Sequence, residues 1–146
     1  MVEDDWGRDA TLATARELVM FLKRPSGQPQ VSTHLAVQEA TRRRIRDLER
    51  WILDHLDEAL TVEALAGRVA MSPRHFARVF ARETGTTPAK FVAAARLELA
   101  RRRLEESELT VGAVARECGF GTAESMRRAF ERHLGMTPRD YRNRLR

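Results

Sequence analysis

Cysteine, lysine and aromatic residues are scarce in this chain of 146 residues, and no long apolar run is present. The single cysteine, Cys118, excludes an internal disulfide framework and any zinc site built from several cysteines. No uninterrupted apolar stretch approaches the roughly 20 residues that span a bilayer, and no signal-peptide pattern is found. We therefore expect a soluble, cytoplasmic protein with no membrane partner.

The patterns that support catalysis are also missing from the sequence. We find no nucleophile matched with a base, no pair of catalytic carboxylates and no glycine loop that would cradle phosphates. The histidines lack metal-ligand spacing; they are His34, His55, His75 and His133. We expect no enzyme activity, no metal site and no cofactor, and we expect Cys118 to be a small buried apolar residue.

Charge is distributed unevenly along the chain. Residues 1–40 carry four basic and six acidic side chains, a net charge of −2, whereas residues 41–146 carry 22 and 15, a net charge of +7. Every basic residue of the second part except Lys90 is arginine. The planar guanidinium group suits phosphates and guanine edges, although a genome rich in G and C would also favour arginine codons. The excess of positive charge makes a polyanion a plausible partner.

Three zones follow one another along the sequence. Apolar residues recur at helical spacing over residues 10–23 and predict an N-terminal helix. Residues 25–36 are rich in Pro, Gly, Ser and Gln and predict a linker that cannot continue this helix. Residues 37–146 are almost entirely helix-periodic and contain no strand signal. The fold class that we expect is all-α.

Start and stop signals divide the third zone into about seven helices. Thr61, Ser72 and Thr110 stand where a hydroxyl can accept a hydrogen bond from the first amides of a helix. Gly85 and Gly135 stand where a left-handed residue would end a helix. The predicted helices cover residues 37–56, 62–69, 73–84, 89–106, 111–118, 123–133 and 138–145.

One pattern occurs twice in the third zone. Residues 60–62, Leu-Thr-Val, recur as residues 109–111 at an offset of 49. Beyond the following turn the offset is 50, and the matched pairs are Arg78 with Arg128, Phe80 with Phe130, Arg82 with Arg132, and Gly85-x-Thr87-Pro88 with Gly135-x-Thr137-Pro138. One residue has therefore been inserted in the second turn, and an internal duplication explains the match.

Each copy reads as a short helix, a turn and a longer helix, which is typical of a helix-turn-helix subdomain. We expect the first over about residues 60–85 and the second over about 110–135. The longer helices would bury one apolar stripe each, made of Phe76, Val79 and Phe80 in the first copy and of Met126, Ala129 and Phe130 in the second. A merely solvated opposite face is the alternative, but it leaves unexplained why arginine recurs at equivalent outward positions.

The helix predicted between the two copies has the length of a spacer. At 1.5 Å per residue, residues 89–106 would extend about 27 Å, and successive major grooves of B-DNA are about 34 Å apart. A rod of this size can hold two recognition helices at neighbouring grooves. Its buried side would carry Ala93, Leu97, Ala100 and Leu104.

Residues 45–146 resemble the DNA-binding domain of the AraC/XylS family of bacterial transcription regulators. The resemblance rests on residues 60–80, on Val-Ala-Arg-Glu-Cys-Gly-Phe at 114–120, and on Gly-Met-Thr-Pro at 135–138 followed by Tyr141-Arg142. Arg96-Leu97 with Ala100 is similar to the family's linker-helix signature. The resemblance to this family implies two helix-turn-helix subdomains, within residues 37–146, joined by a long linker helix.

Residues 1–24 resemble a different family. Glu-Asp-Asp-Trp-Gly-Arg-Asp at 3–9 and Phe-Leu-Lys-Arg-Pro-Ser-Gly-Gln at 21–28 look like the last segment of the amidotransferase-like (PfpI-type) domain of GlxA-type regulators. The resemblance implies that this helix is the tail of a missing N-terminal domain. Its apolar stripe would pack on the DNA-binding domain, pair with another copy or stay mobile.

The resemblance to the AraC/XylS family also implies which residues face the DNA bases. In the first copy these are Arg74, Ala77 and Arg78; the two arginines can each contact guanine, whereas Ala77 offers only a methyl contact to thymine. The equivalent positions of the second copy are Ala123, Glu124, Arg127 and Arg128. Glu124 would either accept a hydrogen bond from cytosine or orient a neighbouring arginine, and both interpretations stay open.

Other polar residues suit the phosphate backbone. Hydroxyls and amides at helix starts bind phosphate, and arginines on the flanks of a recognition helix reach the backbone. The candidates are Ser72, His75, Arg82, Thr122, Arg132 and, on the spacer helix, Arg101.

Together these observations favour sequence-specific binding of double-stranded DNA for transcriptional control, with two recognition helices in successive major grooves. The alternative is a helical interaction module, or a non-specific DNA-binding module, that does not read bases. RNA polymerase is a second candidate partner, and a homodimer through the missing domain or the N-terminal helix is left open.

Overall fold

The computed structural model describes residues 28–145, with side chains from residue 32, and these residues form seven helices and no strand. The prediction of an all-α fold is therefore confirmed. The chain divides into two compact units, residues 1–44 and 45–146. The helix expected at residues 10–23 and the resemblance of residues 1–24 lie outside the described residues. The helices are α2 (Gln28–Asp54), α3 (Val62–Arg68), α4 (Pro73–Thr84), α5 (Pro88–Glu106), α6 (Val111–Glu117), α7 (Ala123–Leu134) and α8 (Pro138–Leu145).

The first of these helices begins earlier than the sequence predicts. α2 starts at Gln28, so residues 28–36, which we expected to belong to a linker, are helical. Pro29 lies in the first turn of α2, where a missing amide costs no helical hydrogen bond. A proline therefore stops a helix that arrives from upstream but does not prevent one from starting.

The predicted caps are present at three helix starts and at two helix ends. The side chains of Thr61, Ser72 and Thr110 each accept a hydrogen bond of 3.1 Å from the amide three residues later. Gly85 ends α4 with φ +81° and Gly135 ends α7 with φ +70°, the left-handed conformation that glycine adopts without strain. At these five positions the local sequence therefore marks where a helix begins or ends.

Each copy of the repeat closes around its own core. In the first, Leu65 of α3 and Phe76 and Phe80 of α4 are at most 1% exposed, and they pack with Ile45 and Ile52 of α2. In the second, Val114 and Cys118 of the α6 segment pack with Met126 and Phe130 of α7 and with Leu104 of α5. The burial of Cys118, at 0% exposure, is as predicted.

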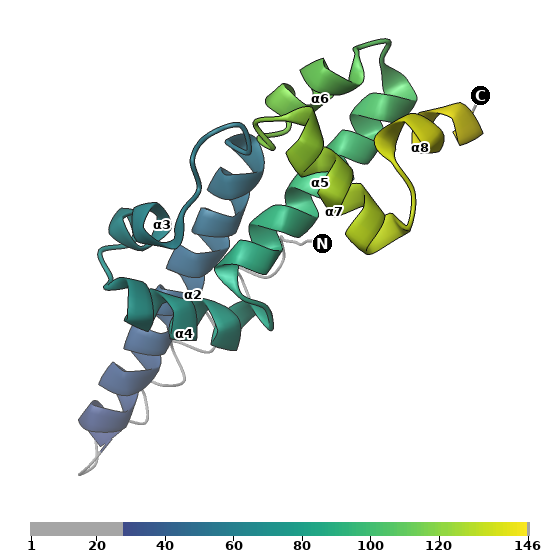
Figure 1. Cartoon of the computed structure of the whole chain (residues 1–146). Coiled ribbons are helices and arrows are strands. Elements are labelled where there is room, and N and C mark those ends of the chain that lie inside the picture. Colours follow the sequence, from purple (N-terminus) through teal and green to yellow (C-terminus); the bar gives the residue numbers. More distant parts are fainter. Residues whose placement is uncertain (1–27, 146) are drawn as a thin grey trace. The chain divides into compact units, whose positions relative to one another are not determined.

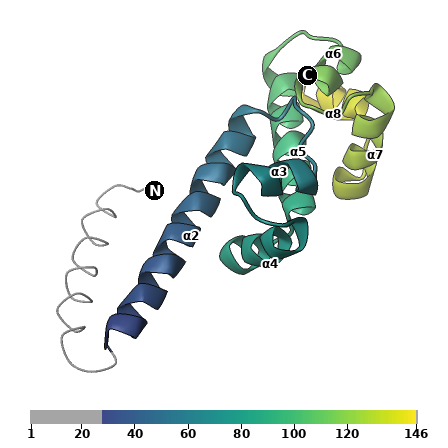
Figure 2. The same ribbon diagram turned by 90° about the vertical axis from the view of Figure 1, so that its left-hand side faces the viewer.

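Helix α5 takes part in both cores. Val92 belongs to the first cluster, and Ala100 and Leu104 belong to the second. Figures 1 and 2 show α4 near the first turns of α5 and α6 near its last turns, in agreement with the helix contacts. Ala93, which we expected on the buried side, is exposed, because the stripe that faces the cores passes through Val92.

A second contact joins the two copies away from the α5 cores. The Arg96 guanidinium donates to the carbonyl oxygens of Leu56, at 3.0 Å, and Glu58, at 2.7 Å, in the connection between α2 and α3. Gly119, in the turn between α6 and α7, lies against the same Leu56 carbonyl. A Cβ atom at Gly119 would be 1.8 Å from that oxygen. Close approach of two backbones therefore requires glycine here.

The first copy shows that positive φ alone does not require this glycine. Ala70 occupies the position equivalent to Gly119 at the offset of 49 residues, and it adopts φ +58°. Ala70 is exposed, so its side chain faces solvent rather than the backbone of the other copy. The demand for glycine at 119 is therefore due to the contact between the copies.

We predict that Gly119→Ala destabilises the protein much more than Gly121→Ala does. Both glycines have positive φ, +89° and +84°, but a Cβ at Gly121 meets no atom within 4 Å. Gly121→Ala should cost about 1–2 kcal/mol from backbone strain alone. Gly119→Ala should cost about 1–3 kcal/mol more, because the Leu56 carbonyl must move. Denaturant unfolding monitored by circular dichroism measures both, and equal losses would contradict the proposed role of the contact.

Candidate nucleic-acid interface

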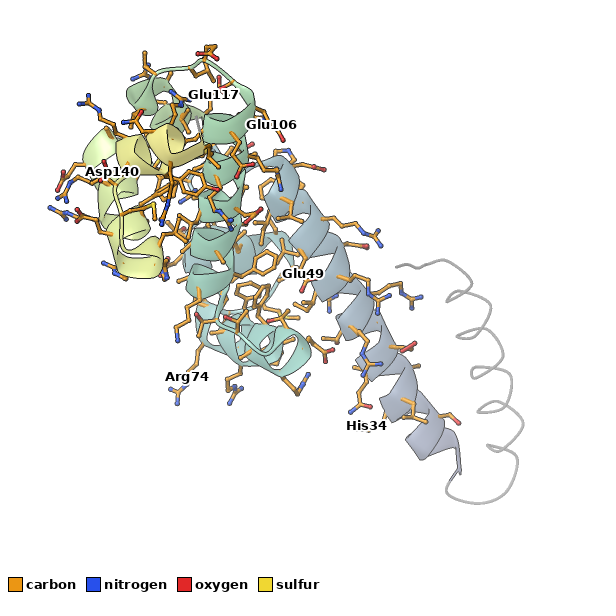
Figure 3. All side chains as sticks on the ribbon, turned by 90° about the vertical axis from the view of Figure 1, so that its right-hand side faces the viewer. His34, Glu49, Arg74, Glu106, Glu117 and Asp140 are labelled. Carbon is orange, nitrogen blue, oxygen red and sulfur yellow. The ribbon has the colours of Figure 1, made fainter. Side chains whose placement is uncertain are left out.

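Helix α4 presents a face of arginines with little else around them. Phe76, Val79 and Phe80 point into the core at 0–2% exposure, which leaves the opposite side of the helix to solvent. Arg74 and Arg78 are exposed on that side, and neither forms a hydrogen bond or an ion pair with any residue that the structure describes. Figure 3 shows Arg74 extending away from the body of the protein. Two guanidinium groups are thus available for an external ligand.

The other outward positions of α4 are less open. Ala77 is half-buried, so it can present only part of its methyl group. Arg82 is exposed and its Nε lies 3.6 Å from a carboxylate oxygen of Glu83. His75 is exposed beside Arg74. The base-contact and phosphate-contact candidates of the first copy therefore share one accessible face.

Helix α7 carries as many arginines, but carboxylates hold two of them. The Glu124 carboxylate accepts from Nε and Nη2 of Arg127, at 2.9 and 2.6 Å, and from Nε of Arg128, at 3.1 Å. Arg127 also donates through Nη1 to Glu131, at 2.6 Å. Arg132 is exposed and forms no hydrogen bond or ion pair with the residues that the structure describes. Ala123, at the start of the helix, is exposed as well.

These hydrogen bonds perturb the titration of the groups involved. Bonds from Arg127 and then Arg128 lower the pKa of Glu124 to about 2. The hydrogen bond with Glu124, and then that with Glu131, raises the pKa of Arg127. Glu124 is therefore charged wherever the protein would meet DNA, and it neutralises part of the arginine charge on α7.

Two residues at helix starts combine a cap with a free donor. Ser72 and Thr122 accept hydrogen bonds from His75 and Ser125 amides at 3.1 and 3.0 Å. A hydroxyl that accepts in this way can still donate its hydrogen to an external oxygen. Both side chains lie at the N-terminus of a helix of 12 residues, where the dipole favours an anion.

A groove separates α5 from the flank of α7. Its volume is about 420 Å³, and the side of α7 that lines it carries Ser125, Arg128 and Arg132. Arg96 and Ala93 line it from α5. Two of the candidate DNA contacts of the second copy therefore border this groove.

The structure places Arg101 in a contact between helices. Its Nε donates to the Tyr141 hydroxyl of α8 at 3.1 Å, and its Nη1 donates to Glu98 at 3.1 Å. The hydrogen bond with Tyr141 raises the pKa of Arg101. This guanidinium already has two partners, and its expected contact with phosphate stays a prediction.

Sequence reasoning missed the arginines that bind backbone carbonyls. Arg142 donates to the carbonyls of Leu104 and Ser107, at 3.2 and 3.3 Å, and to that of Leu109. It thereby ties α8 to the end of α5, as Arg96 ties α5 to the α2–α3 connection. The only signal was that both arginines stand in motifs of the family resemblance. Spacing alone cannot show that a carbonyl lies nearby.

The described residues give no sign of a metal site or a membrane span. They contain no cluster of three or more histidine, cysteine or acidic side chains placed to hold a metal ion. Among them, no helix combines the length and the apolar character needed to cross a bilayer.

The chain is similar to known proteins in both sequence and structure. The family described as "Helix-turn-helix domain" matches residues 65–144. The HTH-type transcriptional regulator Rv1931c of Mycobacterium tuberculosis is 58% identical over 78 residues, which are 53% of this chain and 30% of that protein. The HTH-type transcriptional activator RhaS of Escherichia fergusonii is 36% identical over 104 residues, 71% of this chain and 37% of that protein. The chain thus spans about a third of the length of these relatives.

Solved structures have the same arrangement of helices. The DNA-binding domain of the global transcriptional factor AdpA, crystallised with a target DNA, superposes with a TM-score of 0.66 at 39% identity. The match covers 68% of this chain and 90% of that domain. A probable AraC family transcriptional regulator from Rhodopseudomonas palustris matches with a TM-score of 0.61 at 27% identity, over 71% of this chain and 98% of that one.

We predict that the Glu124 carboxyl titrates far below pH 4.5. The folded-state pKa of about 2 lies below the ordinary value of 4.5, so the stabilisation from this pair is present above pH 4.5 and is lost as the pH falls toward 2. A carbon-detected NMR titration should show Arg127→Ala moving the midpoint up toward 4.5. Arg132→Ala, which removes an arginine that does not contact Glu124, should leave it unchanged. A wild-type midpoint near 4.5 would contradict the bidentate pair.

We also predict that Cys118 does not react in the folded protein. The thiol is buried, and burial raises its pKa to about 11, so thiolate is scarce at neutral pH. A chromogenic thiol reagent at pH 8 should register no thiol in native protein and one thiol per chain in denaturant. Rapid reaction of native protein would show that the second core is open.

Proposed function

Because the chain belongs to this helix-turn-helix domain family, in its AraC-type form, we propose that it is a sequence-specific regulator of transcription that binds double-stranded DNA. In this proposal α4 and α7 enter successive major grooves, held apart by α5. The observation that carries it is the exposed pair Arg74 and Arg78, which face solvent from a helix whose other side is buried. The target DNA in the AdpA structure supports the same use of this fold here.

Base recognition would begin with these two arginines. A guanidinium fork can donate two hydrogen bonds to O6 and N7 of guanine, and each such pair discriminates against a wrong base by about 1–3 kcal/mol. Arg74 and Arg78 are one helical turn apart, so they would reach neighbouring base pairs. Ala77, between them on the helix, leaves space for a thymine methyl group.

The second helix would read bases through a different set. Arg128 is the counterpart of Arg78, and it shares the Glu124 carboxylate with Arg127. Ala123 is exposed at the tip of the helix. We therefore expect the second half-site to be read by a carboxylate and two arginines acting as one unit.

Phosphate contacts would fix the register of the protein on the duplex. Ser72 and Thr122 would donate from the two helix N-termini, and Arg82 and Arg132 would reach the backbone from the flanks. His75 would add a contact beside Arg74. Arg101 would contribute least, because Tyr141 and Glu98 already occupy its guanidinium.

For residues 1–24 the proposal rests on the sequence alone. Residues 3–9 and 21–28 resemble the end of a PfpI-type domain, so we propose that residues 1–24 correspond to that segment of a GlxA-type regulator. In this proposal the protein works in the cytoplasm, RNA polymerase is a second candidate partner, and two copies would pair through that domain or the N-terminal helix. Residues 37–146 would then be the DNA-binding domain.

The proposed function is tested by selecting duplexes from a randomised pool with the 146-residue chain. Wild-type protein should enrich one motif and should bind it at least about 10³-fold more tightly than random duplex at physiological salt. Equal affinity for selected and random duplex would instead identify the module that does not read bases.

We predict that Arg78→Ala weakens binding to the selected duplex about 5- to 100-fold, with a much smaller effect on random duplex. The matched control is Arg132→Ala, which removes the same charge from a phosphate-contact position. It should weaken both duplexes alike and reduce the slope of log K against log salt by about 1. Equal losses on both duplexes for both variants would contradict the assignment of Arg78 to base recognition.

A further inference from the structure

The two recognition helices differ in how much of their positive charge is free. On α4, Arg74 and Arg78 have no hydrogen-bond or ion-pair partner among the residues described. On α7, Arg127 and Arg128 are both bound to Glu124, and Arg127 is bound to Glu131 as well. These four groups carry no net charge, and Arg132 alone remains unpaired on that face within the described chain.

The repeat shows where this difference arises. The offset of 50 residues places Glu124 at the position of Arg74, so a carboxylate stands where the first copy has a base-reading arginine. The same offset places Arg127 at Ala77 and Glu131 at Ala81. Three members of the network, Glu124, Arg127 and Glu131, are therefore absent from the first copy, and only Arg128 has an arginine counterpart there, Arg78.

Stability does not account for the network. Glu124, Glu131 and Arg128 are about half or more exposed, at 51%, 46% and 68% of their side-chain areas, and exposed ion pairs add little to folding stability. A carboxylate facing a polyanion also costs binding affinity. A group that stabilises little and opposes the phosphates requires another explanation.

The geometry of the hydrogen bonds to Glu124 supplies an explanation for the network. Three hydrogen bonds reach the Glu124 carboxylate, and a carboxylate has about four acceptor positions, so one position remains for a donor on a base. In the major groove the exocyclic amine of cytosine is the usual donor to a carboxylate. Where that amine is absent, Glu124 would face the duplex with its charge uncompensated by any base.

We infer that Glu124 is a specificity-determining residue, which restrains Arg127 and Arg128 and makes the binding of α7 conditional on the base sequence. The inference rests on the proposed function. In this account α4 binds without such a condition, through its phosphate contacts on any duplex and its base contacts on its own half-site. Helix α7 adds discrimination by rejecting duplexes that lack its half-site. A half-site with a cytosine opposite Glu124 is the ligand that α7 fits.

The test compares Glu124→Gln with Glu131→Gln in the full chain. Each variant removes one negative charge from an exposed position of α7, but only the first breaks the bridge between Arg127 and Arg128. Affinity is measured on the selected duplex and on random duplex over a range of salt concentrations. Thermal melting of both variants checks that they remain folded, as expected for exposed side chains.

Glu124→Gln should bind random duplex about tenfold more tightly than wild type and lower the ratio of selected to random affinity by about tenfold or more. Its salt slope on random duplex should become steeper by about 1–2, because the freed arginines reach phosphates. Glu131→Gln should change the ratio less than about threefold. Duplexes selected with Glu124→Gln should lose the preference at one base pair of the α7 half-site.

Three results would overturn the inference. Equal gains on both duplexes for both variants would show that only net charge matters. A Glu124→Gln variant with an unchanged ratio would show that the carboxylate does not discriminate, while the proposed function would stand. A wild-type chain that does not distinguish selected from random duplex would remove the proposed function and this inference together.

Discussion

The position of each recognition helix depends on α5, because this helix contributes side chains to both cores. Val92 packs in the core of the first copy, and Ala100 and Leu104 pack in that of the second. A single helix shared by two cores cannot bend without disturbing one of them. The second link, from Arg96 and Gly119 to the Leu56 carbonyl, restricts rotation about α5. Two helices held at a fixed separation are what binding to a duplex with regularly spaced grooves requires.

Duplication gave the two copies one framework, and their surfaces have since diverged. Caps, glycine ends and aromatic core residues recur at matched positions, because each copy must solve the same packing problem. The outward positions carry no such demand, and there Arg74 is matched by Glu124. Ala70 and Gly119 differ because only the turn of the second copy, at Gly119, lies against the Leu56 backbone that precedes the first copy. The two copies therefore share their helix ends and cores but differ in the charged residues on their outward faces.

Much of this fold could be predicted from the sequence, because its signals are local. Helix starts at Thr61, Ser72 and Thr110 follow from side chains that bond the nearest amides. The repeat indicated which residues point outward, and the spacing of Glu124 with Arg127 and Arg128 already allowed an ion pair. The contacts of Arg96, Arg101 and Arg142 could not be predicted, because their partners lie 33 to 40 residues away in sequence. The start of α2 at Gln28 was missed because the composition of residues 25–36 outweighed the tolerance of a first turn for proline.

The most direct test of the central claim is a methylation-interference experiment on the selected duplex. Methylation of guanine N7 blocks the major-groove edge that an arginine would contact. Two recognition helices held by α5 predict interference at two clusters of guanines about one helical turn apart, roughly 10 base pairs, on one face of the duplex. A single cluster, or interference spread evenly along the duplex, would contradict an arrangement in which α4 and α7 enter successive major grooves.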